Sequence, residues 1–319
     1  MPRILCIGET MVQVTPSRGG RISTDTDFRL VAGGAESNVA AMLAKLGVPS
    51  TWIGAVGADP FGEIIRRSLE QDGVDTSFVR VDESSKTAVY FKDVLPESTK
   101  VFYYRESSAM SAAGPELLDV VASQTWDVIH LSGITPALSA NCENLTRQAI
   151  EDGKFGAALK SFDINYRPSL WPEGKAAPIL QELANHCDVV FVGLDEATAL
   201  WGSQTAEDVR AVLPNPRWLV VKDSENSATE INQEGIWAEP AIEVNIVEKV
   251  GAGDAFAAGW LASFLKNQPA NLRLRTGHIM AAQVLKTHTD TANPPTPDEL
   301  AEALKLGNEE GKFAVPKDV

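Results

Sequence analysis

The sequence predicts an α/β fold in which helices cover both faces of a mostly parallel sheet. Short apolar runs alternate with segments of helical spacing from residue 128 to residue 192, which is the strand and helix rhythm of such a sheet. A hydrophobic content of 44% over 319 residues is ample for a sizeable core. No linker or internal repeat divides the chain. We therefore expect one domain over residues 1–319.

Composition excludes several classes of function. The net charge of -15 opposes nonspecific binding to nucleic acid or to an anionic membrane. Cys6, Cys142 and Cys187 are scattered, which indicates neither a disulfide framework nor a zinc site. No apolar run is long enough to span a bilayer, and Glu9 interrupts the N-terminal apolar segment too early for a signal peptide. We expect a cytoplasmic protein without nucleic-acid or membrane partners.

The chain opens with an apolar run at residues 4–7 that is typical of a buried parallel strand. Glu9 follows its carboxyl end, where ligands of open α/β sheets bind, so it is a candidate lining residue or else an exposed loop residue. Gly33 and Gly34 precede a helix. They either let the backbone come close to a ligand or simply give the chain a flexible entry into the helix. The apolar positions of that helix have helical spacing and end at a glycine, being Val39, Met42, Leu43, Leu46 and Gly47.

The character of the sequence changes between residues 78 and 105, after a further strand and helix. Residues 51–56 predict a strand and residues 60–72 a helix that ends at Gly73. Residues 78–81, 87–94 and 100–105 are rich in β-branched and aromatic residues and have no helix between them, which predicts antiparallel strands. Short alternations within residues 11–31 predict further small strands outside the main sheet. Three side chains on these strands can either line a pocket or simply pack, namely Tyr90, Tyr103 and Arg105.

The second half of the chain predicts the rest of the parallel sheet. Strands are expected at residues 128–131, 157–163, 189–192 and 217–222. Helices are expected between them at residues 141–151 and 176–184, and two closing helices at 272–287 and 298–306. The segment 162–171 leaves a strand and breaks at Pro168, which places Asn165 and Arg167 on a loop at the carboxyl edge. A guanidinium there suits a carboxylate or phosphate, although a loop arginine can equally be solvated.

Near the C-terminal end, the sequence predicts a strand that runs into a glycine turn. Ile242, Val244 and Ile246 alternate with polar residues, which is the period of a half-buried strand. The turn Gly251-Ala252-Gly253 then opens a helical run of small and apolar residues. Because the first amides of a helix have no partners within it, this turn can hold an anion.

The next residue, Asp254, places a carboxylate beside this anion site. A carboxylate there repels an anionic ligand unless it has another task, and its chemistry suits removal of a proton from a hydroxyl group. The alternative is an N-cap, in which Asp accepts a hydrogen bond from a backbone amide.

The segment GAGDAFAAG at residues 251–259 resembles the C-terminal signature of the ribokinase-like (PfkB) family of ATP-dependent sugar kinases. The resemblance implies that Asp254 is the catalytic base and that the amides of Gly251, Ala252 and Gly253 form the anion hole. It also implies a three-layer α/β/α domain with a mostly parallel central sheet. A small β-lid is expected from residues 11–34 and 78–106.

Two further segments carry the resemblance. Residues 33–38 match the first family signature, and residues 162–171 closely resemble the Asp-x-Asn-x-Arg-Pro-x-Leu-Trp segment of 2-keto-3-deoxygluconate kinases. Together they imply a sugar site made of Glu9, Gly33, Gly34, Asn38, Tyr90, Tyr103, Arg105, Asn165, Arg167 and Asp254.

The nucleotide side follows the family less closely. The resemblance implies that Glu196 places Mg²⁺ and that ATP lies near Lys222, Ser224, Gly251 and Gly253. Three positions depart from the family pattern: Gly193 replaces an Asn, residues 223–227 replace a glycine-bearing turn, and residues 248–250 replace Asp-Thr-Thr.

We therefore expect ATP-dependent phosphorylation of a sugar-acid hydroxyl, with 2-keto-3-deoxygluconate converted to its 6-phosphate. A kinase for a neutral ketose such as fructose is the first alternative. A catalytically silent protein that binds sugar or nucleotide is the second, because the departures all touch the nucleotide side. By resemblance we expect a homodimer, since an exposed β-lid favours pairing between copies.

Overall fold

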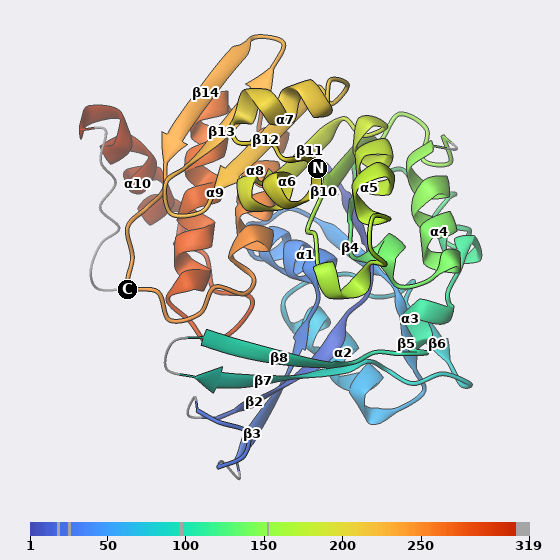
Figure 1. The fold of residues 1–319 in the computed structure, drawn as a ribbon. Coiled ribbons are helices and arrows are strands. Elements are labelled where there is room, and N and C mark those ends of the chain that lie inside the picture. The colour runs from blue at the N-terminus through green and yellow to red at the C-terminus, as the bar shows by residue number, and fades with distance from the viewer. Residues whose placement is uncertain (18–19, 25–26, 96–97, 152, 311–319) are drawn as a thin grey trace.

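The computed structural model describes residues 1–17, 20–24, 27–95, 98–151 and 153–310. Its centre is an eight-stranded sheet in which six neighbouring strands pair in parallel and the last two strands in the chain are added by antiparallel pairing, which confirms the α/β class (Figure 1). In spatial order its strands are β14 (Gly235–Pro240), β13 (Ser227–Asn232), β12 (Trp218–Asp223), β11 (Val189–Gly193), β10 (Leu159–Asp163), β9 (Val128–Ser132), β1 (Ile4–Ile7) and β4 (Ser50–Ile53).

Helices bury both faces of this sheet because successive strand residues point to opposite sides. Leu5 and Ile7 join one apolar cluster, whereas Ile4 and Cys6 join the other. The second cluster also contains residues of α1 (Ala35–Lys45), α2 (Pro60–Gln71), α8 (Ala252–Leu265), α9 (Ala270–Leu285) and α10 (Pro297–Glu310). The first contains residues of α3 (Ala109–Ala112), α4 (Ala140–Glu151), α5 (Ala176–Asn185), α6 (Leu194–Trp201) and α7 (Ala206–Val212).

A separate four-stranded sheet lies below the main body of the domain in Figure 1. Its order is β3 (Phe28–Gly33), β2 (Met11–Pro16), β7 (Val89–Leu95) and β8 (Ser98–Tyr104). The central pair β2 and β7 is parallel, and the two outer pairs are antiparallel. We call this sheet the lid. Of the expected lid segments, residues 18–19, 25–26 and 96–97 lie outside the described residues.

The prediction that residues 78–81 form an antiparallel strand is wrong. β6 (Arg80–Asp82) pairs parallel with β5 (Ala55–Gly57) in a two-stranded sheet of its own. The single strand predicted at residues 51–56 is divided between β4 and β5. The division falls at Gly54, where a Cβ atom would stand only 2.5 Å from the Gly8 carbonyl oxygen.

The strand predicted at residues 242–246 is also wrong, because this segment has no regular secondary structure. Hydrogen bonds hold the chain just before and just after this segment. The Ala241 amide donates to the Asn226 carbonyl in a turn, and the Val247 amide donates to the Leu285 carbonyl at the end of α9. The hairpin β13–β14 and helices α6 and α7 precede this segment in the chain, and the sequence analysis did not predict them. Short 3-10 turns complete the fold at Pro115–Leu118, Thr135–Ala137 and Pro168–Leu170.

Candidate active site

The glycine turn lies at the N-terminus of α8, between two adjoining cavities. Gly251 has φ +87°, a left-handed conformation that L side chains rarely adopt. A Cβ atom on it would lie 2.2 Å from the carbonyl oxygen of Asp290. Glycine is therefore required here both by the backbone angle and by the space. The free amides of the first helical turn give this end of α8 a partial positive charge.

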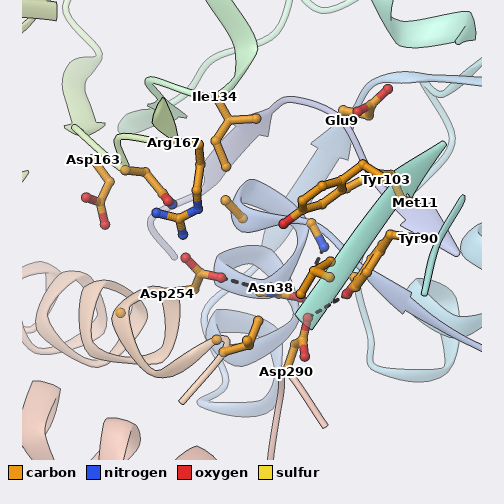
Figure 2. A pocket seen from close by; sticks show the side chains of 18 of the residues that line it. Glu9, Met11, Asn38, Tyr90, Tyr103, Ile134, Asp163, Arg167, Asp254 and Asp290 are labelled. Atoms are coloured by element: carbon orange, nitrogen blue, oxygen red, sulfur yellow. Dashed lines mark hydrogen bonds between the residues drawn. The ribbon is translucent and has the colours of Figure 1, made fainter. Parts of the chain in front are cut away.

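A first cavity of about 390 Å³ lies between this turn and the lid, and we call it the lid cavity. Each sugar-site residue predicted from the sequence lines it, and Figure 2 shows several of these side chains around a common space. The lid strands contribute Tyr90 and Tyr103, while Asn38 comes from α1 and Arg167 from the loop after β10. Segments that are far apart in the sequence are thus brought together around one cavity.

Asp254 lies in the first turn of α8 and faces the lid cavity. The Asn38 Nδ2 atom donates to Asp254 Oδ2 at 2.8 Å, as drawn in Figure 2. The pKa of Asp254 is raised from 3.8 to about 7, mainly because burial disfavours the charged form. The hydrogen bond from Asn38 and the charges of Arg167 and Lys222 oppose this rise, and the charge of Asp163 adds to it. A carboxyl group with such a pKa can accept or release a proton near neutral pH.

The two arginines predicted for the sugar site differ in their environment. Arg105 donates through Nε to Glu9 Oε2 at 2.8 Å, and its Nη2 contacts the same oxygen. Ser108 Oγ donates to the other oxygen of Glu9. Glu9 therefore balances the charge of Arg105. The side chain of Arg167 is 48% exposed, and its carboxylate partner, Glu196, is 3.7 Å away.

A polar cluster lies where the strands β10, β11 and β12 end. Lys222 Nζ pairs with Asp163 Oδ2 at 2.9 Å, while Asp163 Oδ1 is buried and has no hydrogen-bond partner among the described residues. Glu196 accepts from the amides of Tyr166 at 3.0 Å and Gly193 at 2.9 Å. Burial, and then the charge of Asp163, raises the pKa of Glu196 to about 6.

Asp163 was not among the residues singled out from the sequence. A signal for it existed, because it begins the Asp-x-Asn-x-Arg run and occupies the last position of β10, where a ligand of a parallel sheet binds. It lines the lid cavity together with Asn165, whose φ of +40° reflects the sharp exit from the strand.

A second cavity of about 720 Å³ lies on the other side of the turn, against α9, and we call it the α9 cavity. Its apolar wall includes Ile242, Val244 and Ile246, together with Ala281, Ala282 and Leu285 of α9. Three predicted nucleotide-side residues line it, namely Lys222, Ser224 and Gly253, whereas Gly251 lines only the lid cavity. The two cavities share Glu196, Lys222, Lys249 and Gly253.

Within the part of the chain that the structure describes, no three His, Cys, Asp or Glu side chains gather into a metal cage. None of the helices described there is long and apolar enough to cross a membrane.

Comparison with known proteins identifies the family. A profile described as pfkB family carbohydrate kinase matches residues 1–297. The chain is 30% identical over 312 residues to the 2-dehydro-3-deoxygluconokinase of Thermoproteus tenax, covering 96% of this chain and 95% of that one. It is 28% identical to the 2-dehydro-3-deoxygalactonokinase of Haloferax volcanii, with 96% and 97% covered. It is also 31% identical to the probable fructokinase-7 of Arabidopsis thaliana, with 82% and 78% covered.

Solved structures agree on the fold. A PfkB protein from Polaromonas sp. JS666 superposes with a TM-score of 0.84 at 28% identity, covering 95% of this chain and 100% of the other. The 2-dehydro-3-deoxygluconokinase of Thermotoga maritima superposes with a TM-score of 0.87 at 22% identity, covering 95% and 98%. The fold is therefore ribokinase-like, as the sequence predicted. With its turn, its two adjoining cavities and a family profile that spans nearly its whole length, the chain belongs to the pfkB family of carbohydrate kinases.

Proposed function

We propose that this kinase transfers the γ-phosphoryl group of ATP to the 6-hydroxyl of 2-keto-3-deoxygluconate. The observation that carries the proposal is Arg167, whose side chain is 48% exposed and lines the same cavity as Asp254. The names of relatives at 28–30% identity, which are 2-dehydro-3-deoxygluconokinases and a 2-dehydro-3-deoxygalactonokinase, support the same class of acceptor.

In this proposal Asp254 removes the proton of the acceptor hydroxyl. The hydroxyl oxygen then bonds to the γ-phosphorus, the bond from that phosphorus to the β–γ bridging oxygen breaks, and ADP leaves. Asn38 holds the carboxylate of Asp254 in place through its hydrogen bond. The amides of Gly251, Ala252 and Gly253 stabilise the charge on the transferring group, because helix N-termini favour anions.

The nucleotide fits the α9 cavity. The apolar wall formed by Ala281, Ala282 and Leu285 suits a base, and the shared residues Lys222 and Gly253 lie where the phosphates would approach the lid cavity. Ser224 lies on the same rim and is the further residue proposed to contact the nucleotide.

The residues present also fit Mg²⁺. Magnesium is commonly held by one or two carboxylates together with phosphates and water rather than by a full protein cage. Glu196 would supply one carboxylate, and Asp163, with its buried unpartnered oxygen, a second. When bound, the ion neutralises phosphate charge during transfer.

The acceptor is proposed to be an acid because the two arginines are not equivalent. Arg105 is occupied by Glu9, so its proposed role is to orient the lid side of the sugar site through Glu9. Arg167 has Glu196 3.7 Å away and donates through Nη1 to the Tyr166 carbonyl at 3.1 Å, but its side chain is 48% exposed and lines the cavity, where the carboxylate of an acceptor can bind it. Hydrogen bonds to charged groups contribute about 1.5 to 3 kcal/mol, or about 10- to 100-fold in preference.

A neutral ketose such as fructose is the second candidate, and one observation favours it. With Glu9 balancing Arg105, the lid side of the cavity carries no net positive charge from this pair. Several similar proteins of Arabidopsis thaliana are named probable fructokinases.

The test is ADP release with ATP and Mg²⁺ across 2-keto-3-deoxygluconate, 2-keto-3-deoxygalactonate, fructose and no sugar. Arg167→Ala should lower kcat/KM for the preferred acid by about 10- to 100-fold and change the fructose value much less. Arg217→Ala is the matched control, because Arg217 is exposed and lines neither cavity. A wild-type preference for fructose would overturn the acid assignment. No ADP with any sugar and no heat of ATP binding would support a silent binder.

We also propose a homodimer formed through the lid. Exposed apolar side chains lie on its two outer strands, with Phe28 and Leu30 on β3 and Phe102 and Tyr104 on β8. Sedimentation of the wild type should give twice the chain mass, and Leu30→Glu should shift it towards the monomer. A wild type that sediments as a monomer at assay concentrations rejects the proposal.

A further inference from the structure

Lys92, on the lid strand β7, is among the largest fully buried side chains of the protein. It is 1% exposed. Its Nζ lies 2.6 Å from Asp290 Oδ1 and 4.0 Å from Glu248 Oε2, and both of these carboxylates are also buried. A lysine is rarely buried this fully unless it is paired, because its charge loses the solvation of water. The ammonium group therefore bridges two carboxylates within the protein interior.

The two carboxylates belong to the two segments that flank the glycine turn. Glu248 lies three residues before Gly251, and its Oε1 accepts from the amides of Lys249 at 2.9 Å and Val250 at 3.4 Å. Asp290 lies in the loop after α9, and its carbonyl oxygen is the atom that would meet a Cβ on Gly251. The same two segments thus form the approach to the turn and the wall against it.

The lid strand holds Asp290 by both of its carboxylate oxygens. Tyr90, two residues before Lys92 on β7, donates its hydroxyl to Asp290 Oδ2 at 2.8 Å, a contact drawn in Figure 2. Lys92 takes the other oxygen. Because Tyr90 also lines the lid cavity, the residues that cover the acceptor are tied to the backbone that shapes the anion hole.

We propose that Lys92 is a positioning residue, whose buried ammonium keeps the segments at Glu248 and Asp290 together and thereby holds the Gly251–Gly253 amides in register with the lid. This inference rests on the proposed function. Lys92 also lines the lid cavity, but its ammonium group is held by Asp290 and Glu248. It acts through Asp290 and Glu248, and its removal leaves two buried carboxylates that repel each other.

The expected kinetic effect depends on whether the amides bind the ground state or the transition state. They stabilise charge that develops as the phosphoryl group is transferred, so their displacement lowers kcat more than it raises the KM of the acceptor. Lys92→Met keeps a chain of similar length without the charge, and we expect kcat to fall at least about tenfold, since one such donor is worth about 10²- to 10³-fold. Lys92→Arg keeps the charge and should recover part of the loss.

The matched control is Lys100→Met, which removes an exposed lysine from the neighbouring lid strand β8. Amide hydrogen exchange over residues 248–254 gives a second readout that needs no turnover. We expect faster exchange there in Lys92→Met, with the α5 amides unchanged, and wild-type exchange in Lys100→Met. If Lys92→Met does not fold, Asp290→Asn removes one of the two carboxylates with little change of shape and should give the same lower kcat and faster exchange.

Ammonium ions provide a rescue test in Lys92→Ala. A small cation that enters the vacated space should restore kcat in a saturable way, whereas tetramethylammonium, which is too large, should not. Wild-type kcat and wild-type exchange over residues 248–254 in a folded Lys92→Met would overturn the inference. A wild type that phosphorylates no sugar would instead reject the proposed function, and the exchange measurement would still decide the role of Lys92.

Discussion

The pH dependence of turnover is the sharpest test of the role proposed for Asp254. Burial raises the pKa of this carboxyl group to about 7, so the group is protonated, and unable to accept a proton, below that pH. With a single pKa near 7, about one tenth of the molecules carry the carboxylate at pH 6 and about nine tenths at pH 8. We therefore expect kcat/KM to rise about tenfold from pH 6 to pH 8 and to fall about tenfold per pH unit further into acid.

The assay is ADP release at saturating ATP and Mg²⁺ with limiting acceptor, from pH 5 to pH 9 at constant ionic strength. Asp254→Asn should lower kcat by about 10²-fold or more, because it removes the base with little change of shape. Its residual activity should lack the step near pH 7. Glu196→Gln is the control, since burial raises the pKa of Glu196 to about 6, and this variant should keep the step.

Two results would refute the reasoning. One is near-normal turnover in Asp254→Asn, which would show that proton removal does not depend on this carboxylate. Helix capping is not its role in the structure, because the N-cap of α8 is Gly251 and Asp254 lies within the first helical turn. The other is a step near pH 7 that persists in Asp254→Asn and disappears in Glu196→Gln, which would assign the titration to the carboxylate at the boundary of the two cavities.

Three other predictions follow from the same site. Gly251→Ala should lower kcat at least about tenfold more than Gly253→Ala, and equal losses would contradict this prediction. A left-handed φ costs about 1–2 kcal/mol for an L residue, and the new Cβ at position 251 would lie 2.2 Å from the Asp290 carbonyl oxygen. At position 253 the nearest atom to a new Cβ is Lys222 Nζ, 3.5 Å away. Glu196→Gln should raise the Mg²⁺ concentration for half-maximal rate by about tenfold or more, as measured by Mg²⁺ titration. The raised pKa of Asp254 stabilises the folded state fully below the ordinary pKa of 3.8, and this stabilisation is lost as pH rises through about 7. Asp254→Asn removes the buried charge that is present at pH 8, so it should raise Tm more at pH 8 than at pH 5. The reverse order in calorimetry would contradict this prediction.

The residues that carry local signals were predictable from the sequence. The turn at Gly251–Gly253 is a glycine pattern before an apolar helix, and the loop with Asn165 and Arg167 follows directly from a strand end and Pro168. Such features depend on a few neighbouring residues. Their meeting in one cavity depended on the family resemblance, because the spacing alone left alternatives open at each position.

The errors have a physical cause in each case. Ile242, Val244 and Ile246 line the α9 cavity, but so does Glu243 between them, so the alternation of apolar and polar residues does not correspond to two faces of a strand. The strand β13 was missed because Glu230 interrupts its apolar pattern. That glutamate is nevertheless fully buried, paired with Arg273 from α9 and accepting from the indole of Trp260.

The buried bridge around Lys92 shows what sequence reasoning lacked. Nothing in the residues next to Lys92 distinguishes it from an exposed lysine such as Lys100. Its partner Asp290 is 198 positions away, so only the folded chain reveals the pairing. For the same reason Asp290 was not predicted as part of the site.

The contact between Gly251 and Asp290 also sets how short a working chain can be. A chain that ended after α9 at Leu285 would retain each of the three sequence signatures and still lack the wall against which the turn is shaped. Truncation experiments and domain grafts that keep only the signatures should therefore yield inactive protein. We therefore expect the catalytic unit of this kinase to extend at least to residue 290, where a loop without any recognised motif lies against Gly251 and lines the lid cavity.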